Sequence, residues 1–420
     1  MTTAASAGAP HAGVPRWVFL ALLAFALLVR VALVVVTPFG QSVAHRIEGL
    51  NDEPAQLNYV RYLAEHHRLP VQRHHYLEPG AFERGDYEYF QPPLYYIVCD
   101  PLVAAARASS AALFACRAVS FACGALSLVV IGLIFGRLGT SPSCRRLGVL
   151  FVALLPTHAY FSSLTSNDSL SWLIALLIVH QMLVLLDQSR GASDATFVGF
   201  DLRLGFLLAL GLLTKTSIAV FAPLVVLAYL WVAWRARAPR AALAALIPLG
   251  VALVVAGPWY WRNVALYGSP TAFAVGFGPP ESGLVSLHGV VHTLRASTRY
   301  FWFPMQHVPG VPAVMAVRYG EAALTAGHAV AAALFLARAR RASDLAMGLV
   351  LAAVACGQIV MGFMWSNVEG RYLLPALAPV AYLIVAPVFS FASRWRGGER
   401  LAWAYVCLLA VHAWGLLAFA

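Results

Sequence analysis

The sequence predicts an all-α polytopic membrane protein, and three observations support this class: the composition, the long apolar runs and the placement of the basic residues. Of the 420 residues, 60% are hydrophobic and only 11% are charged. A soluble globular domain is roughly 45–50% apolar and about 25% charged, so a water-soluble fold of this composition could not cover its own surface with polar groups. We therefore expect most of the surface to face lipid.

Eleven apolar runs are spaced along the chain, and we expect each to cross the membrane as a helix, because about 20 apolar residues span a hydrocarbon core of roughly 30 Å. The first run, 17–36, is too long for the core of a cleavable signal peptide, so it predicts a signal anchor behind a cytoplasmic tail at 1–16. The other runs lie near 111–136, 147–163, 169–187, 199–213, 216–234, 241–261, 319–337, 345–365, 371–391 and 401–419.

Two hydrophilic segments, about 37–92 and 262–318, are too polar to cross the membrane. They hold most of the residues capable of chemistry, and we expect them to be extracytoplasmic loops that include amphipathic helices. The remainder predicts a single transmembrane catalytic domain over 17–420, with no separate soluble domain.

The formal net charge of +11 comes from arginines in short gaps between apolar runs. Examples of these gaps are 137–146, 235–240, 338–341 and 394–400. Basic residues in short loops mark the cytoplasmic side of a membrane protein, whereas a nucleic-acid partner would require one basic face with stacking aromatics. The charge therefore predicts membrane topology and no nucleic-acid binding. The Arg and Ala bias suggests a GC-rich bacterial genome, and hence the bacterial inner membrane.

The topology depends on the apolar stretch 93–106, which is short and interrupted by Asp100 and Pro101. If this stretch crossed the membrane, every later basic gap would face outward, against the positive-inside rule. We therefore predict a re-entrant or interfacial helix here and eleven crossings, with a cytoplasmic N-terminus and an outward C-terminus. The alternative is twelve crossings.

Metal and disulfide sites have little support in the sequence. Five of the six cysteines lie in apolar runs, there is no CxxC spacing, and the histidine pairs lack a carboxylate at a standard zinc spacing. We predict no metal site and no required cofactor, although the pattern does not exclude a divalent metal.

The first candidate acids, Asp52 and Glu53, open a segment in which Leu57, Val60 and Leu63 recur at helical spacing. This pattern is typical of an amphipathic helix at the membrane surface. A carboxylate at this boundary could take a proton from an acceptor hydroxyl. The alternative is that both acids only stabilise the positive end of the helix dipole.

Two further polar motifs face the same side in this topology. Gln91 precedes a proline pair and Tyr95, where the polar loop turns back into the bilayer, and alone this reads as an interfacial anchor. Asn167 and Asp168 lie in a very short outward turn. Asp168 is a candidate acid, but an aspartate in such a turn is often only the N-cap of the next helix.

The candidate cations are Lys215, Arg262 and Arg371, all at outward helix ends. Lys215 could hold a phosphate as a point charge or simply snorkel to the interface. Arg371 lies between Glu369 and Tyr372, and its guanidinium could bind a phosphate through two parallel hydrogen bonds or pair with Glu369. Arg262 ends an aromatic belt and is a further phosphate-binding candidate.

The order of these motifs resembles the GT-C superfamily of membrane glycosyltransferases, in the branch with the aminoarabinose transferases of lipid A and the protein O-mannosyltransferases. The resemblance runs from about residue 45 to 380. It rests on Asp52-Glu53, Gln91-Pro92-Pro93-Leu94-Tyr95-Tyr96, Asn167-Asp168, Leu213-Thr214-Lys215, Pro258-Trp259, Arg262-Asn263 and Glu369-Gly370-Arg371-Tyr372. It implies a GT-C-like helix bundle and a sugar donor carried on polyprenyl phosphate. Many relatives carry a soluble C-terminal domain that this sequence lacks, so the acceptor is not implied.

The resemblance implies an inverting glycosyltransferase acting on an extracytoplasmic acceptor hydroxyl of a lipid, glycan or protein. Asp52 or Glu53 would be the base, with Asp168 beside the same cavity. The donor phosphate would bind Lys215, Arg371 and Arg262. The substrate pocket would hold Gln91, Tyr95, Asn167, Glu369 and Tyr372. Two alternatives remain: a lipid-linked-sugar flippase or transporter, whose path would be lined by ionisable residues, and a catalytically inert partner of an envelope complex.

Overall fold

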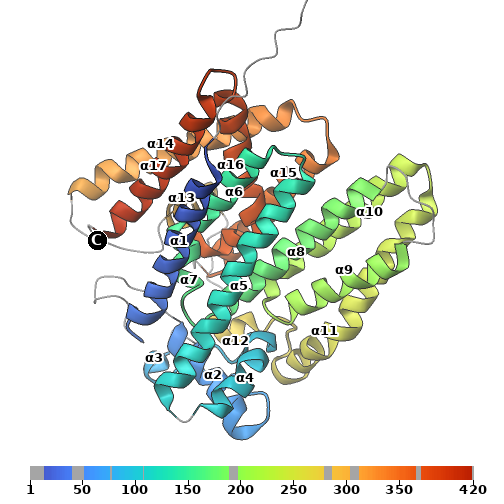
Figure 1. Ribbon diagram of the computed structural model, residues 1–420. Helices are drawn as coiled ribbons and strands as arrows, with labels where there is room; N and C mark the ends of the chain where they lie inside the picture. The colour runs from blue at the N-terminus through green and yellow to red at the C-terminus, as the bar shows by residue number, and fades with distance from the viewer. Residues whose placement is uncertain are drawn as a thin grey trace, which may run out of the picture.

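In the computed structural model, every regular element of the described residues is helical (Figure 1). The structure describes residues 14–39, 52–75, 78–106, 108–188, 197–278, 286–302, 312–365 and 370–418. The all-α prediction is therefore confirmed for this part of the chain.

The helices follow one another in this order: α1 (Arg16–Val36), α2 (Glu53–His66), α3 (Ala81–Arg84), α4 (Leu94–Ala105), α5 (Ser109–Arg137), α6 (Pro142–Ala153), α7 (Pro156–Phe161), α8 (Asn167–Gln188), α9 (Phe197–Leu212), η2 (Thr216–Val220), α10 (Phe221–Ala236), η3 (Pro239–Ala245), α11 (Leu246–Tyr267), α12 (Phe273–Phe277), α13 (Leu287–Trp302), α14 (Pro312–Ala337), α15 (Ala342–Trp365), η4 (Gly370–Ala376), α16 (Leu377–Ala392) and α17 (Gly398–Ala418). The helices marked η are 3₁₀ helices, which have a tighter turn.

Within the described residues, 7 helices are long and apolar enough to cross a membrane, which fits a multi-pass membrane protein. The other predicted runs also fold as helices: 147–163 as α6 and α7, 199–213 mostly as α9, 319–337 within α14, and 401–419 mostly as α17. The short helices α2, α3, α4 and α12 gather at one end of the bundle (Figure 1). α2 and α3 come from the first hydrophilic segment, α12 comes from the second, and α4 is the short apolar stretch after the first.

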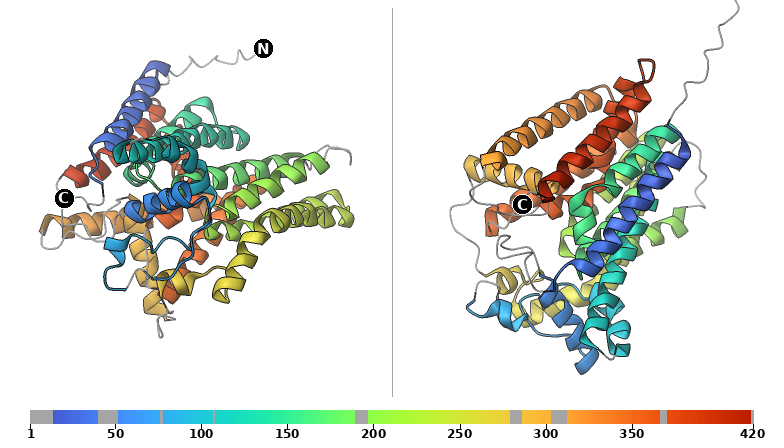
Figure 2. Two further views of the ribbon diagram at one scale, coloured as in Figure 1. Left: turned by 90° about the horizontal axis from the view of Figure 1, so that it is seen from below. Right: turned by 60° about the vertical axis from the view of Figure 1, so that its left-hand side comes forward.

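The spanning helices differ in how much protein surrounds them. In α8, 72% of the most apolar window is buried, whereas in α1 only 11% is buried, and α1 lies along the outside of the bundle (Figure 2). Trp17, Phe25 and Leu28 of α1 are exposed at 59–70% of their surface, as lipid contact requires. The helix that begins with Asn167 and Asp168 is thus the central one.

α5 and the turn before α8 come very close together at Gly124. A Cβ atom at this position would lie 2.5 Å from the Cβ of Ser162, so only glycine allows this approach. Small residues have this role in many membrane helix interfaces.

One charge lies deep inside the bundle. The Arg30 side chain of α1 is fully buried and donates hydrogen bonds to the backbone carbonyls of Ala26, Val152 and Ala153. It also contacts His158 Nδ1 of α7 at 3.1 Å. A charged group is tolerated at such a depth when protein groups replace its water shell, so this contact set holds α1 against the break between α6 and α7.

The amphipathic pattern of α2 is confirmed, but its apolar side faces protein rather than lipid. Leu57, Val60 and Leu63 are buried in one cluster with Tyr96 of α4, and Tyr59 stacks on Tyr96 at 3.8 Å between ring centroids. The prediction of a helix lying on the membrane surface does not describe these contacts, because the sequence cannot tell lipid from a neighbouring apolar helix. α4 itself has 12 residues, or about 18 Å at 1.5 Å per residue, which is too short to span a bilayer.

Candidate active site

The candidate site is built around a break in the chain between α7 and α8. After Phe161 the chain makes a buried polar turn, and α8 begins at Asn167. Asp168 lies inside the first helical turn, 2% exposed, and its carboxylate accepts a hydrogen bond from Ser166 Oγ at 3.3 Å. Asp168 is therefore not the residue before the helix, and its carboxylate points to partners from other elements.

Two cations hold this carboxylate. Lys215, in the break between α9 and η2, forms an ion pair with Asp168 Oδ1. Arg371 of η4 approaches Asp168 Oδ2 with Nη1 at 3.4 Å, and its Nη2 donates to Asp52 Oδ2 at 2.7 Å. The structure thus brings four predicted residues together, and we call Asp52, Asp168, Lys215 and Arg371 the bridged cluster. Its formal charges cancel.

Aromatic rings line the cationic side of the bridged cluster. The ring centroid of Tyr372 lies 5.3 Å from Lys215 Nζ and 5.4 Å from Arg371 Cζ, and that of Phe161 lies 5.0 Å from Arg371 Cζ. Cations at such distances are attracted to the ring faces. Tyr372 therefore lies where the sequence placed it, beside the predicted phosphate ligands.

Glu53 has a different environment from Asp52, its neighbour in sequence. Its carboxylate, with no exposed surface, accepts hydrogen bonds from Arg117 Nε at 2.8 Å and Nη2 at 2.6 Å, and from the Thr165 amide at 2.7 Å. Arg117 also donates to the carbonyls of Val34 and Thr37. These contacts tie α2 to α5 and to the end of α1, and they give Glu53 an anchoring position. The sequence did not point to Arg117, because it lies within an apolar run.

Two predicted pocket residues support the turn before α8. The Tyr95 hydroxyl hydrogen-bonds to Ser120 Oγ at 2.8 Å and accepts from the Ser166 amide at 3.1 Å. Asn167 Nδ2 donates to the Thr214 carbonyl at 3.3 Å, next to Lys215. Both residues hold the backbone that carries the charged groups. Glu369 lies outside the described residues.

Arg262 does not join the bridged cluster through any contact in the described part of the chain. Its Nη2 donates to the Pro70 carbonyl at 2.6 Å, and its Cζ lies 5.0 Å from the Trp259 ring centroid. Pro70 follows α2, so Arg262 ties the end of α11 to the first hydrophilic segment. A role as phosphate ligand stays a prediction for this residue.

Glu88 belongs to the site, but the sequence analysis missed it. Its side chain is 6% exposed, and the Gln91 side chain hydrogen-bonds to it. Burial raises the pKa of Glu88 well above its usual value, and the negative charge of Asp52 raises it further, while Lys215 and Arg371 partly oppose both effects. Nothing in the sequence separates Glu88 from the other acids of its loop, such as Glu78 and Asp86.

Among the described residues, no three His, Cys, Asp or Glu side chains are grouped to hold a metal ion. His74 and His75 of the first hydrophilic segment contact Glu78: His74 Nδ1 lies 2.9 Å from Glu78 Oε2, and the His75 amide donates to Glu78 Oε1 at 3.1 Å.

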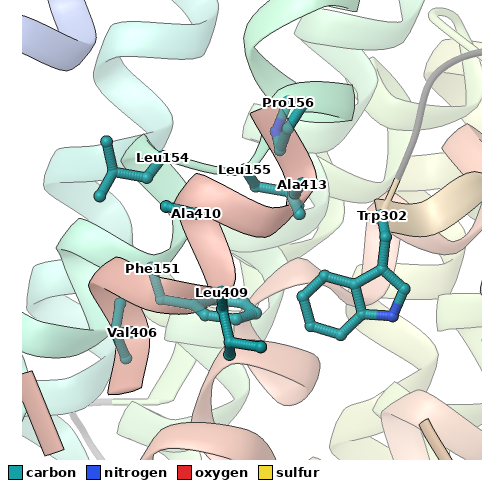
Figure 3. A pocket seen from close by; sticks show the side chains of 9 residues that line it. All are labelled: Phe151, Leu154, Leu155, Pro156, Trp302, Val406, Leu409, Ala410 and Ala413. Carbon is teal, nitrogen blue, oxygen red and sulfur yellow. The ribbon is translucent and has the colours of Figure 1, made fainter. Parts of the chain in front are cut away.

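A small apolar recess lies apart from the charged groups (Figure 3). It is formed by α6, α17 and Trp302 of α13, and Leu154, Leu155 and Pro156 at the start of α7 close one side. No ionisable side chain lines it, so it suits hydrocarbon rather than a polar ligand.

The helix bundle has the GT-C fold. It is similar to ArnT, an aminoarabinose transferase of Cupriavidus metallidurans, bound to undecaprenyl phosphate. The two are 16% identical, the alignment covers 93% of this chain and 63% of ArnT, and the TM-score is 0.59. The apo form of the same ArnT is 17% identical to this chain, and the TM-score is 0.56. That alignment covers 91% of this chain and 61% of ArnT.

The archaeal oligosaccharyltransferase AglB of Archaeoglobus fulgidus, in complex with an inhibitory peptide and a dolichol-phosphate, is a second similar structure. It is 14% identical, 95% of this chain and 54% of AglB are covered, and the TM-score is 0.53. The chain thus spans less than two thirds of either protein. No protein-family model and no curated protein matches the sequence. Likeness at this level of identity establishes the fold.

Proposed function

We propose that the protein is an inverting glycosyltransferase that moves a sugar from a polyprenyl-phosphate donor to an acceptor hydroxyl on the extracytoplasmic face of a bacterial inner membrane. One observation carries the proposal: Arg371 joins Asp52 to Asp168, which Lys215 also holds, so a proton acceptor and two cations meet in one buried place. Glycosyl transfer from a lipid phosphate needs these two kinds of group, one for the acceptor proton and one for the leaving phosphate.

The two aspartates differ in accessibility, and this difference supports different roles for them in the proposed reaction. The Asp52 side chain is 25% exposed, whereas that of Asp168 is 2% exposed and held by two cations. An acceptor hydroxyl can reach Asp52 but not Asp168. Asp52 is thus the base, and Asp168 orients Lys215 and Arg371.

The reaction is a single displacement. The acceptor oxygen attacks the anomeric carbon, its proton passes to Asp52, and the bond between that carbon and the phosphate oxygen breaks. The charge released on the polyprenyl phosphate is stabilised by Lys215 and Arg371, which are already in place and partly shielded from water. Attack from the opposite face of the sugar inverts the anomeric configuration.

The nature of the donor is supported by the similar structures: the ArnT structure holds undecaprenyl phosphate and the AglB structure holds a dolichol-phosphate. The extracytoplasmic side is supported by the basic gaps of the sequence.

The test is release of free polyprenyl phosphate from a polyprenyl-phosphate sugar when purified protein and an acceptor pool from the same envelope are mixed. We expect Asp52→Asn to lower turnover at least about a hundredfold, because a positioned base contributes 10²–10⁴-fold. Glu65→Gln, at an exposed position on the same helix, is the matched control. Near-normal turnover in Asp52→Asn would refute the assignment of the base. Movement of the lipid-linked sugar across vesicles without release of polyprenyl phosphate would favour a flippase.

A further inference from the structure

Glu88 is held in a defined place beside the bridged cluster. Its loop precedes α4, the Gln91 amide donates to the Glu88 carbonyl at 3.1 Å, and the Phe90 amide donates to Gln72 Oε1 at 2.9 Å. The Oε2 oxygen of Glu88 is buried and has no hydrogen-bond partner among the described residues. A buried polar atom without a partner is costly, so this oxygen would gain from a ligand that hydrogen-bonds to it.

The charged and titratable groups around Glu88 come from several elements. Asp52 at the start of α2 acts on it with a negative charge, and Lys215 before η2 and Arg371 of η4 act with positive charges. Tyr87 in the same loop and Tyr96 of α4 also lie within reach of its charge. Glu88 thus shares its surroundings with the groups that would hold the donor phosphate.

The charges around Glu88 bear on whether its carboxyl group is protonated. The two acids and two cations of the bridged cluster cancel, so an ionised Glu88 would leave the site negative just where an anionic phosphate has to enter. Burial and the charge of Asp52 raise the pKa of Glu88, which favours the protonated form near neutral pH. A protonated carboxyl group carries one O–H donor, which a carboxylate lacks.

We propose that Glu88 binds the phosphate of the lipid donor as a neutral hydrogen-bond donor, beside Lys215 and Arg371. This inference rests on the proposed function and adds a third residue to its phosphate site. Three observations support this inference: Glu88 Oε2 has no partner among the described residues, the Glu88 side chain is buried, and the proposed phosphate-binding cations are its neighbours.

A dependence on pH follows from this role. The raised pKa means that the protonated form is complete at low pH and is lost as the pH rises through that pKa. Above it, the hydrogen bond to phosphate is lost and a like charge appears beside the ligand. Phosphate binding therefore weakens toward alkaline pH.

The experiment measures binding of a polyprenyl phosphate, without sugar or acceptor, to the full chain in nanodiscs between pH 7 and pH 9.5. A phosphate monoester has its second pKa near 6, so the ligand keeps about the same charge over this range. The variants are Glu88→Gln, which keeps a donor but cannot ionise, Glu88→Ala, which has neither, and Glu65→Gln as an exposed control. Ratios to wild type isolate the effect of Glu88, because the other residues of the site are the same in every variant.

We expect wild type and Glu65→Gln to lose at least about fivefold in affinity over the range, and Glu88→Gln to lose much less. At pH 7 Glu88→Gln binds like wild type, whereas Glu88→Ala binds about 2–10-fold more weakly, the effect of one hydrogen bond. Equal pH dependence in wild type and Glu88→Gln overturns the inference, and so does Glu88→Ala binding like wild type.

Failure of the proposed function gives another result: wild type then binds the polyprenyl phosphate no better than the polyprenyl alcohol at any pH. Should Glu88→Gln not fold, infrared difference spectra of wild type with and without the lipid replace it. A protonated-carboxyl band that shifts on binding supports the inference, and the absence of such a shift overturns it.

Discussion

Two buried ion-pair regions start from neighbouring residues of α2, and they are built in opposite ways. The Glu53–Arg117 pair is closed: both side chains are at most 1% exposed, and backbone groups from Thr165, Val34 and Thr37 complete its hydrogen bonds. The bridged cluster is open on one side, because Asp52 keeps 25% of its side-chain surface exposed.

The difference shows how adjacent acids come to serve stability and chemistry separately. In the closed pair nearly every hydrogen-bond donor and acceptor already has a protein partner, so few groups are available to bind a ligand. In the bridged cluster Arg371 is shared between two carboxylates, and an incoming phosphate can replace one of them without leaving a buried charge alone.

Breaking the closed pair should have the largest effect, and it should be on stability. Glu53→Gln leaves the Arg117 guanidinium buried without a counter-charge, and such a change costs about 3–5 kcal/mol. Thermal unfolding in detergent measures it, with Glu65→Gln on the same helix as control. Glu53→Gln combined with Arg117→Met should be more stable than Glu53→Gln alone, because it removes both charges. A double variant less stable than the single one would contradict this account.

Breaking the bridged cluster should act on turnover instead. Lys215→Met removes one cation aimed at the leaving phosphate, and losing one such group costs about 10²–10³-fold in kcat. We expect little change in unfolding temperature, because Arg371 still pairs with Asp168. Arg68→Met, at an exposed cation after α2, is the control. A loss of stability as large as that of Glu53→Gln would erase the contrast.

The smallest effect is expected at the turn that the two regions share. The Thr165 amide bonds to Glu53 and the Ser166 hydroxyl bonds to Asp168, so Ser166→Ala changes the bridged cluster alone. One hydrogen bond contributes about 0.5–1.5 kcal/mol, which corresponds to a few-fold lower kcat with nearly unchanged unfolding temperature. Ser393→Ala, at an exposed site, serves as comparison. If unfolding temperature falls and kcat does not, Ser166 belongs with the closed pair.

Much of the fold and the four residues of the bridged cluster could be predicted from the sequence. The apolar runs determined the helices because lipid leaves few alternatives to a spanning helix. Asp52, Asp168, Lys215 and Arg371 could be grouped because they end up on one side of the predicted topology and follow a known motif order.

What could not be predicted depends on contacts between distant segments. In the sequence, Glu53 looked equivalent to Asp52. In the structure, Arg117, which lies 64 residues further along the chain, donates hydrogen bonds to both carboxylate oxygens of Glu53. Arg117 itself looked like an isolated charge in an apolar run. Glu88 could be recognised only from its burial and its unpartnered oxygen, neither of which leaves a mark in the sequence.

The buried Arg30 has a consequence for how the protein is made. Its partners Val152 and His158 follow it by 122 and 128 residues, so they do not yet exist when the first helix enters the membrane. Until α7 leaves the ribosome and inserts, Arg30 of that helix lacks these hydrogen-bond partners. Final docking of the first helix is thereby a late step of biogenesis, completed only after several later segments have been inserted.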